Sequence, residues 1–189
     1  MNTPAHLIFG AAAFARPEKP NTLTAALAGA LAPDLSLYLM VGVSIWILDV
    51  PARTVFGDYY YSDAWQSVFA VDNSFILWGA LLAIAFWRKW TIMTAFAGAA
   101  VLHLCFDFPL HTHDARMHFW PVSDWVFQSP ISYWDNRAHA GTVGSMEVTM
   151  SVGLAALLAT RFQRLWPRLV LGVLALAEIF SSGIWRFIF

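Results

Sequence analysis

The chain has 189 residues, of which 59% are hydrophobic and 12% are charged, and its formal net charge is −1. A soluble domain carries about 25% charged residues, so this composition excludes an ordinary soluble domain and favours a protein embedded in a lipid bilayer. The near-zero charge offers no basic surface for a nucleic acid, and a single cysteine, Cys105, excludes an internal disulfide bond.

Apolar segments separated by polar connections predict an all-α fold, a polytopic integral membrane helical bundle with about five to six membrane helices. Thr3 suits the N-cap of the first segment and Pro4 its first turn, and Arg16 and Pro17 end it. This short N-terminal helix reaches roughly 18 Å against a hydrocarbon core of about 30 Å, so we expect it to end inside the membrane. The segments lie at about 4–15, 22–48, 73–87, 91–108, 142–160 and 168–188.

The connections between these segments alternate in charge. We expect residues 1–189 to form one transmembrane domain, with residues 109–141 as an extramembrane loop rich in His and Trp. Basic connections face the cytoplasm by the positive-inside rule, so both termini and the loop 109–141 are expected in the periplasm of a bacterial inner membrane. The basic residues of the short connections are Arg16, Lys19, Arg88, Lys89, Arg161, Arg164 and Arg168.

Ionisable residues occur at similar depths in separate apolar segments. At about 1.5 Å per residue, Asp34, His103 and Glu147 fall within one helical turn of one another, and His6 and Asp107 lie about one turn to either side. Such residues in a membrane are paired, metal-bound or functional. His and carboxylate side chains are ligands of Zn²⁺, Mn²⁺ and Fe²⁺, so a divalent metal site is predicted, with a structural polar network as the alternative.

Three sequence motifs carry a resemblance to a known family. The string TPAHLIFG, the pair APD at residues 32–34, and HLCFD leading to FWP resemble the membrane-bound metal-dependent hydrolase family of YdjM-like inner-membrane proteins. The resemblance covers the first 34 residues and about 103–121. It implicates His6, Asp34, His103 and Asp107 as metal ligands.

The chain departs from that family where many members read PD-x-DH, because here the sequence is PDLSLY. Two candidate ligands are therefore absent. The stretch HTHDARMH follows the H-x₃-D motif at a short distance, so His111, His113 and His118 are candidates to replace them.

Together these features predict a metal-dependent hydrolase that acts on a lipid or lipid-linked phosphoester at the outer membrane face. The expected cofactor is zinc, with manganese or iron as alternatives, and it would lower the pKa of a bound water to about 7. Glu147 is the candidate general base, His113 and His118 are candidates for proton transfer, Asp114 for orienting a histidine, and Arg116 for holding a phosphate. The candidate metal ligands are His6, Asp34, His103, Asp107 and His111.

A non-enzymatic reading stays open at this level. The chain could be an accessory subunit of a larger membrane complex, with the His/Asp layer structural or binding a metal or pigment. A transmembrane histidine such as His103 can ligate a haem. Asp107 lies one turn away on the same helix face and favours an ion instead. The expected partners are a membrane lipid and, in the second reading, a larger complex; no nucleic acid is expected.

Overall fold

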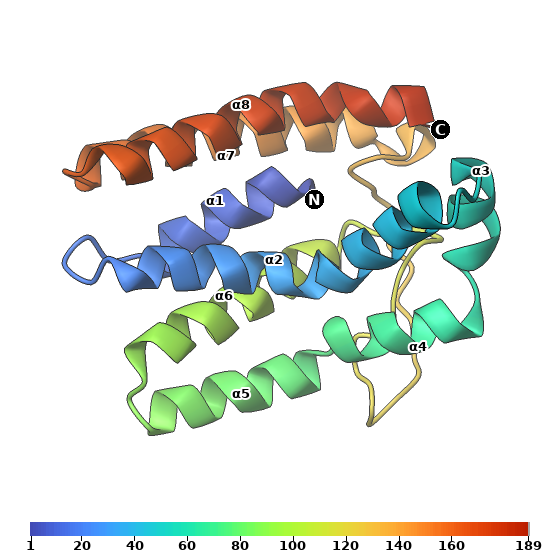
Figure 1. The fold of residues 1–189 in the computed structure, drawn as a ribbon, viewed down its shortest axis with the longest axis horizontal. Helices are drawn as coiled ribbons and strands as arrows, with labels where there is room; N and C mark the ends of the chain where they lie inside the picture. The colour runs from blue at the N-terminus through green and yellow to red at the C-terminus, as the bar shows by residue number, and fades with distance from the viewer. Residues whose placement is uncertain (189) are drawn as a thin grey trace.

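The structure, a computed structural model, describes residues 1–188, and for residues 182–188 it describes only the course of the last helix. Figure 1 shows a bundle of helices that run roughly along one direction. No β-strand occurs in the described residues, so the predicted all-α class is confirmed. The helices are α1 (Thr3–Phe14), α2 (Asn21–Gly42), α3 (Ala52–Thr54), α4 (Asp63–Asp72), α5 (Phe75–Trp87), α6 (Thr91–Asp107), α7 (Ala140–Arg161) and α8 (Leu165–Ile188).

Three helical stretches of the described chain are long and apolar enough to cross a membrane: Asn21–Ile47, Asp63–Trp87 and Ala140–Arg161. This is fewer than the five to six membrane helices that the sequence predicts. The apolar helices α1 and α6 have only 12 and 17 residues. A stretch of about 20 residues is needed to cross, so neither qualifies by length.

The short helix α1 lies inside the bundle, where it packs against α2, α6, α7 and α8 (Figure 1). Its apolar residues Ile8 and Ala11 are fully buried. They belong to a core cluster with Leu23 of α2 and with residues of α7 and α8. Because α1 begins inside the bundle, its N-terminal residues lie beside the middle of α2, α7 and α8, where Thr3 contacts Asp34 and Asn2 contacts Glu147 and Glu178, which is a position suited to an internal site.

Helices α2 and α6 approach each other closely at a patch of small residues. Ala26, Ala30 and Ala99 are fully buried there. Gly29 has no room for a side chain, since an added Cβ would overlap the backbone carbonyl of Phe96 on α6. The sequence therefore fixes the distance between these two helices with glycine and alanine.

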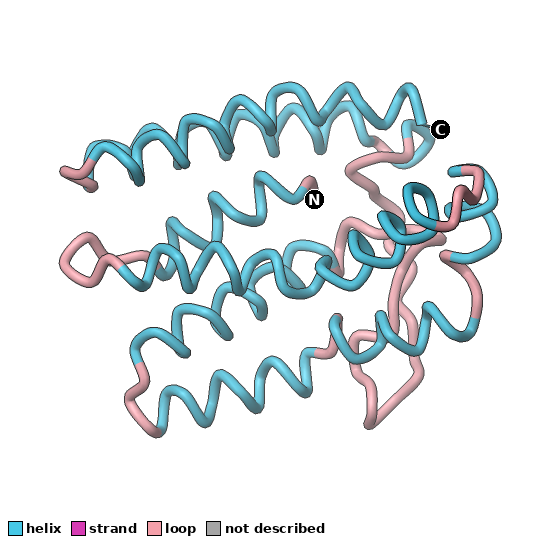
Figure 2. Tube along the Cα trace, in the orientation of Figure 1, coloured by secondary structure: helices cyan, strands magenta, loops and turns pink. Residues whose placement is uncertain are grey.

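The two ends of the bundle differ in character. The basic connections at residues 15–20, 88–90 and 162–164 lie together at one end, on the left in Figure 1. The long segment between α6 and α7, a loop apart from the short 3₁₀ helix Asn136–Ala138, lies at the other end, as Figure 2 shows. This segregation agrees with the alternation of charge that the sequence predicts.

Replacing Gly29 by alanine should destabilise the bundle. The added methyl group has to push α2 away from α6, at a cost of about 1–3 kcal/mol in the free energy of unfolding. Gly79→Ala on α5 is the matched control, because nothing lies within 4 Å of a Cβ at that position. Unfolding of both variants in detergent measures the difference. Equal stability of the two variants would contradict the close approach.

Candidate metal centre

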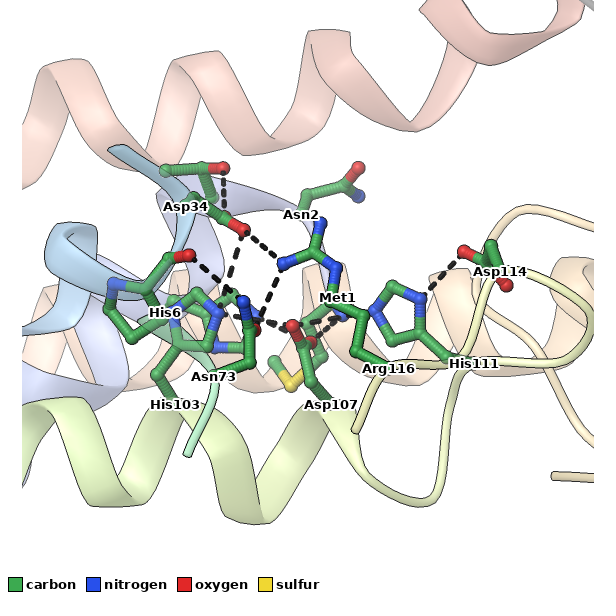
Figure 3. A network of polar contacts seen from close by, with 12 residues as sticks. Met1, Asn2, His6, Asp34, Asn73, His103, Asp107, His111, Asp114 and Arg116 are labelled. Atoms are coloured by element: carbon green, nitrogen blue, oxygen red, sulfur yellow. Dashed lines mark hydrogen bonds and ion pairs between the residues drawn. The ribbon is translucent and has the colours of Figure 1, made fainter. Parts of the chain in front are cut away.

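A buried carboxylate, Asp107, lies at the centre of the candidate site (Figure 3). It ends α6, and its Oδ1 is 2.8 Å from Nε2 of His6 on α1. Its Oδ2 is 3.0 Å from Nε2 of His103, one turn earlier on α6, and 3.4 Å from Nε2 of His111 in the following loop. One ligand atom from each of His6, His103 and Asp107 lies within 4.8 Å of the other two.

The protonation of His103 is constrained by its second ring nitrogen. Nδ1 lies 2.7 Å from the backbone carbonyl oxygen of Ala30, which can only accept, so Nδ1 carries a proton and donates it. The Nε2 lone pair of a neutral His103 would then face the carboxylate of Asp107, and two acceptors repel each other. A cation or a second proton is therefore required between Nε2 and Asp107.

Stacking of the two imidazole rings limits how that positive charge can be supplied. The rings of His6 and His103 stack with centroids 3.6 Å apart and an angle of 11°. Two imidazolium ions at this separation would repel each other, so at most one of the two rings carries a positive charge. A single shared cation satisfies both histidines and the carboxylate at once, which is the arrangement of a metal site.

His111 repeats the pattern of His103 in the loop after α6. Its Nδ1 is 2.6 Å from Oδ2 of Asp114, and the same oxygen accepts a 2.9 Å hydrogen bond from the indole of Trp134. Burial lowers the pKa of His111, but Asp107 and Asp114 outweigh it and raise the pKa to about 9. For Asp114, burial is outweighed by His111 and Trp134, and the pKa falls to about 2. A histidine oriented by a carboxylate in this way is typical of metal ligands.

Positive groups surround the carboxylates. The α-amino group of Met1 donates a 2.7 Å hydrogen bond to Oδ1 of Asp107. Asp34, on α2, lies 3.8 Å from both Nε2 of His103 and Nη1 of Arg116, and accepts a hydrogen bond from the Thr3 hydroxyl. Asp34 therefore links the histidine cluster to a buried guanidinium, as Figure 3 shows.

Arg116 is held from two sides. Its Nη1 donates a 2.9 Å hydrogen bond to Oδ1 of Asn73, which is completely buried between α4 and α5. Its guanidinium lies 4.6 Å from the centroid of the Phe69 ring. Burial lowers the pKa of Arg116, but Tyr60 and Asp34 outweigh this and raise it. Arg116 is thus a permanent, positioned positive charge.

A cavity of about 600 Å³ opens beside this cluster. Its wall includes the site residues Asp34, Asp107, His111 and Arg116. The rest of the wall is largely apolar or aromatic and includes Leu37, Val41, Phe56 and Trp134. It also contains four of the five tyrosines of the chain: Tyr38, Tyr60, Tyr61 and Tyr133. Such a cavity suits a molecule with an anionic group and an apolar body.

The remaining predicted site residues are placed differently. Glu147 is buried on α7, where its Oε1 accepts a hydrogen bond from the backbone N–H of Asn2, and the Asn2 side chain donates to Glu178 on α8. Glu147, the candidate general base, therefore does not line the cavity. His113 is exposed, lines the cavity and lies edge-on to Trp134 at 5.0 Å.

His118 points away from the cavity. Its Nδ1 lies 2.9 Å from the carbonyl oxygen of Asn73, and its ring packs between Phe75 and Phe108 at 5.6 and 5.5 Å. Burial lowers its pKa to about 4. This environment gives His118 a packing role that joins the loop to the start of α5.

Three residues of the site were not predicted from the sequence. Asn73 holds Arg116, Trp134 holds Asp114, and Met1 holds Asp107. Asn73 had a signal, because it is an amide at the edge of an apolar segment, in VDNSF. No pattern marked the other two.

No family model matches the chain, and no curated protein or solved structure matches it significantly.

His118 should make the protein lose stability in mild acid. Its folded pKa of about 4 lies below the unfolded value of about 6.5, so the unfolded state takes up the proton first. The contribution of neutral His118 to the free energy of unfolding is retained above pH 6.5. It is lost as the pH falls toward about 4, by at most roughly 3 kcal/mol. His118→Phe should flatten this part of the stability profile, measured by unfolding in detergent. Identical profiles for both proteins would refute it.

Proposed function

We propose that the protein is a membrane-bound metal-dependent hydrolase, as its sequence resemblance implies, and that it acts on a lipid or lipid-linked phosphoester. One observation carries the proposal: His103 and His111 both direct Nε2 at Asp107 while their Nδ1 atoms are held by acceptors. Histidines fixed in this way direct Nε2 at one shared position, where a bound cation would displace the Nε2 protons.

The residues fit a divalent metal. His6, His103 and Asp107 would hold it, with His111 as a fourth ligand, and zinc favours four such ligands. Asp34 is farther away and is assigned to orienting Arg116 and His103. A bound metal would supply an acidified water and would polarise a phosphoryl oxygen.

The protein's own side chains would bind and orient the substrate. Arg116 supplies the positive charge for a phosphate, since Asn73 and Phe69 hold its guanidinium in place. The apolar and tyrosine-lined wall of the cavity would receive the start of a hydrocarbon chain. His113 is the loop histidine available for proton transfer to a leaving group, because it lines the cavity and is exposed.

We further propose a multi-pass arrangement in a bacterial inner membrane, with α1 and α6 inside the bundle and α8 as an additional spanning helix. The basic end would face the cytoplasm, and the cavity would open toward the periplasm, since basic connections are retained inside. Labelling of Val122→Cys and Arg164→Cys by an impermeant reagent in intact cells distinguishes the two orientations. Labelling at Arg164→Cys alone would reverse the assignment.

A structural role for the polar layer is the second candidate function, and it is supported by the balance of positive and negative charges within that layer. The Met1 ammonium group neutralises Asp107, and Arg116 faces Asp34, so the polar layer is compensated without a metal. In this reading the chain would be an accessory subunit of a larger membrane complex. The two readings differ in one direct property, which is the metal content of the purified protein.

Purified protein should contain about one equivalent of a divalent metal. His103→Ala and Asp107→Asn should each lose most of it, because each removes a donor atom. His139→Asn is the control, since His139 is exposed and has a positive φ that asparagine adopts readily. Elemental analysis provides the measurement. Wild-type protein without metal, or variants that retain it fully, would favour the structural reading.

Metal-loaded protein should hydrolyse phosphatidyl or polyprenyl phosphoesters. Arg116→Gln should lower kcat/KM by roughly 10- to 100-fold, because a charged hydrogen bond of about 1.5–3 kcal/mol is lost. Arg116→Lys keeps the charge, and Arg164→Gln removes a charge at the opposite end of the bundle. If the wild type turns over none of these substrates, or if Arg116→Gln equals Arg164→Gln, the substrate assignment fails.

A further inference from the structure

A second cavity lies at the basic end of the bundle, opposite the candidate metal centre. It has a volume of about 320 Å³ and lies between the α1–α2 turn and the α5–α6 turn. Arg16 and Lys89 line it together with the hydroxyl-bearing Thr91 and Thr94. Part of its wall is apolar and includes Phe86.

The positive groups of this cavity lack acidic partners. Arg16 and Lys89 are exposed, and within the part of the chain that the structure describes neither forms an ion pair. Lys19 adds a third positive charge, because its Nζ donates a hydrogen bond of 3.4 Å to the Thr91 hydroxyl. Glu18 lies in the same turn but forms no ion pair with these groups among the described residues. The cavity therefore combines unpaired basic side chains with hydroxyl groups, which is the chemistry that binds a phosphate.

The position along the helices specifies what kind of phosphate the cavity would meet. The apolar stretch Asn21–Ile47 begins just after the α1–α2 turn, and the stretch Asp63–Trp87 ends just before Lys89. Both stretches are long enough to cross a membrane, so in a bilayer the cavity would lie at the boundary between hydrocarbon and headgroups. Phe86 and Trp87 are 75% and 76% exposed beside it, and aromatic residues of this kind mark that boundary.

We propose that this cavity binds the phosphate headgroup of an anionic glycerophospholipid. Arg16 and Lys89 would contact the phosphate, and the acyl chains would lie against the exposed apolar surface next to Phe86 and Trp87. Basic pockets at one membrane face recognise anionic headgroups in this way. The site is separate from the candidate metal centre and does not depend on the proposed hydrolase activity.

The test is the apparent affinity of the purified full-length protein for phosphatidylglycerol in dodecyl maltoside micelles, measured by microscale thermophoresis. Arg16→Gln/Lys89→Asn should bind roughly 30-fold more weakly, because each basic residue near an anionic lipid contributes about 1 kcal/mol. Asparagine is chosen at position 89 because the backbone there has a positive φ of 56°. Both side chains are exposed, and an unchanged melting temperature without lipid checks the fold.

Arg161→Gln/Arg164→Gln is the matched control, since it removes the same charge from the same end of the bundle but outside the cavity. It should bind phosphatidylglycerol like the wild type. Phosphatidylcholine with the same acyl chains and soluble glycerol 3-phosphate should both bind weakly to the wild type. Equal weakening of the two double variants would mean diffuse charge attraction and would overturn the site. Binding of phosphatidylcholine or glycerol 3-phosphate as tight as that of phosphatidylglycerol would overturn the lipid assignment.

Discussion

A carboxylate inside an apolar bundle has to be neutralised, and Asp107 is the carboxylate on which this protein's internal architecture depends. An isolated ionised group in such an environment would cost tens of kcal/mol, so its neighbours are determined by its charge. His6 and His103 lie within 3.0 Å of its oxygens, and the Met1 ammonium within 2.7 Å. The same demand that requires partners for folding creates a site with affinity for a cation.

The packing of α2 against α6 supplies the geometry of that site. Gly29 lets the two helices approach until no Cβ would fit, and its neighbour Ala30 thereby brings a backbone carbonyl within 2.7 Å of Nδ1 of His103. Helix α1 packs beside these two helices and places His6 at the level of Asp107, with Nε2 of His6 2.8 Å from Oδ1 of Asp107. The packing of small residues therefore determines the chemistry indirectly.

Counting residues along each helix predicts well at which level of the bundle a side chain lies. It predicts poorly toward which neighbouring helix the side chain points. The count placed His6, Asp34, His103 and Asp107 near one level, and the structure brings all four into one cluster. Glu147 lies on α7 and faces Asn2, beside Glu178, because a count says nothing about which way a side chain faces. Within the described residues, three helical stretches are long and apolar enough to cross a membrane, fewer than the five to six membrane helices expected, because apolar composition alone does not distinguish a 17-residue internal helix from a spanning one.

The loop after α6 was the least predictable part. Its density of histidines indicated chemistry, but only the folded loop separates His111, which faces Asp107, from His118, which packs between two phenylalanine rings. Asn73 holds His118, and Trp134 holds Asp114, which in turn holds His111. Asn73 and Trp134 are both distant in sequence from the residues to which they are hydrogen-bonded. Contacts over such separations depend on tertiary structure that no local pattern encodes.

X-ray absorption spectroscopy at the zinc edge of the purified protein is the decisive measurement for the metal centre, because it identifies the atoms around a bound metal. A shell of only nitrogen and oxygen atoms at about 2.0–2.1 Å, without sulfur, is expected and should be lost in His103→Ala. A sulfur atom in the shell would contradict the proposed metal centre, since Cys105 is exposed and is not part of the cluster. A protein that retains no metal at all would contradict it equally.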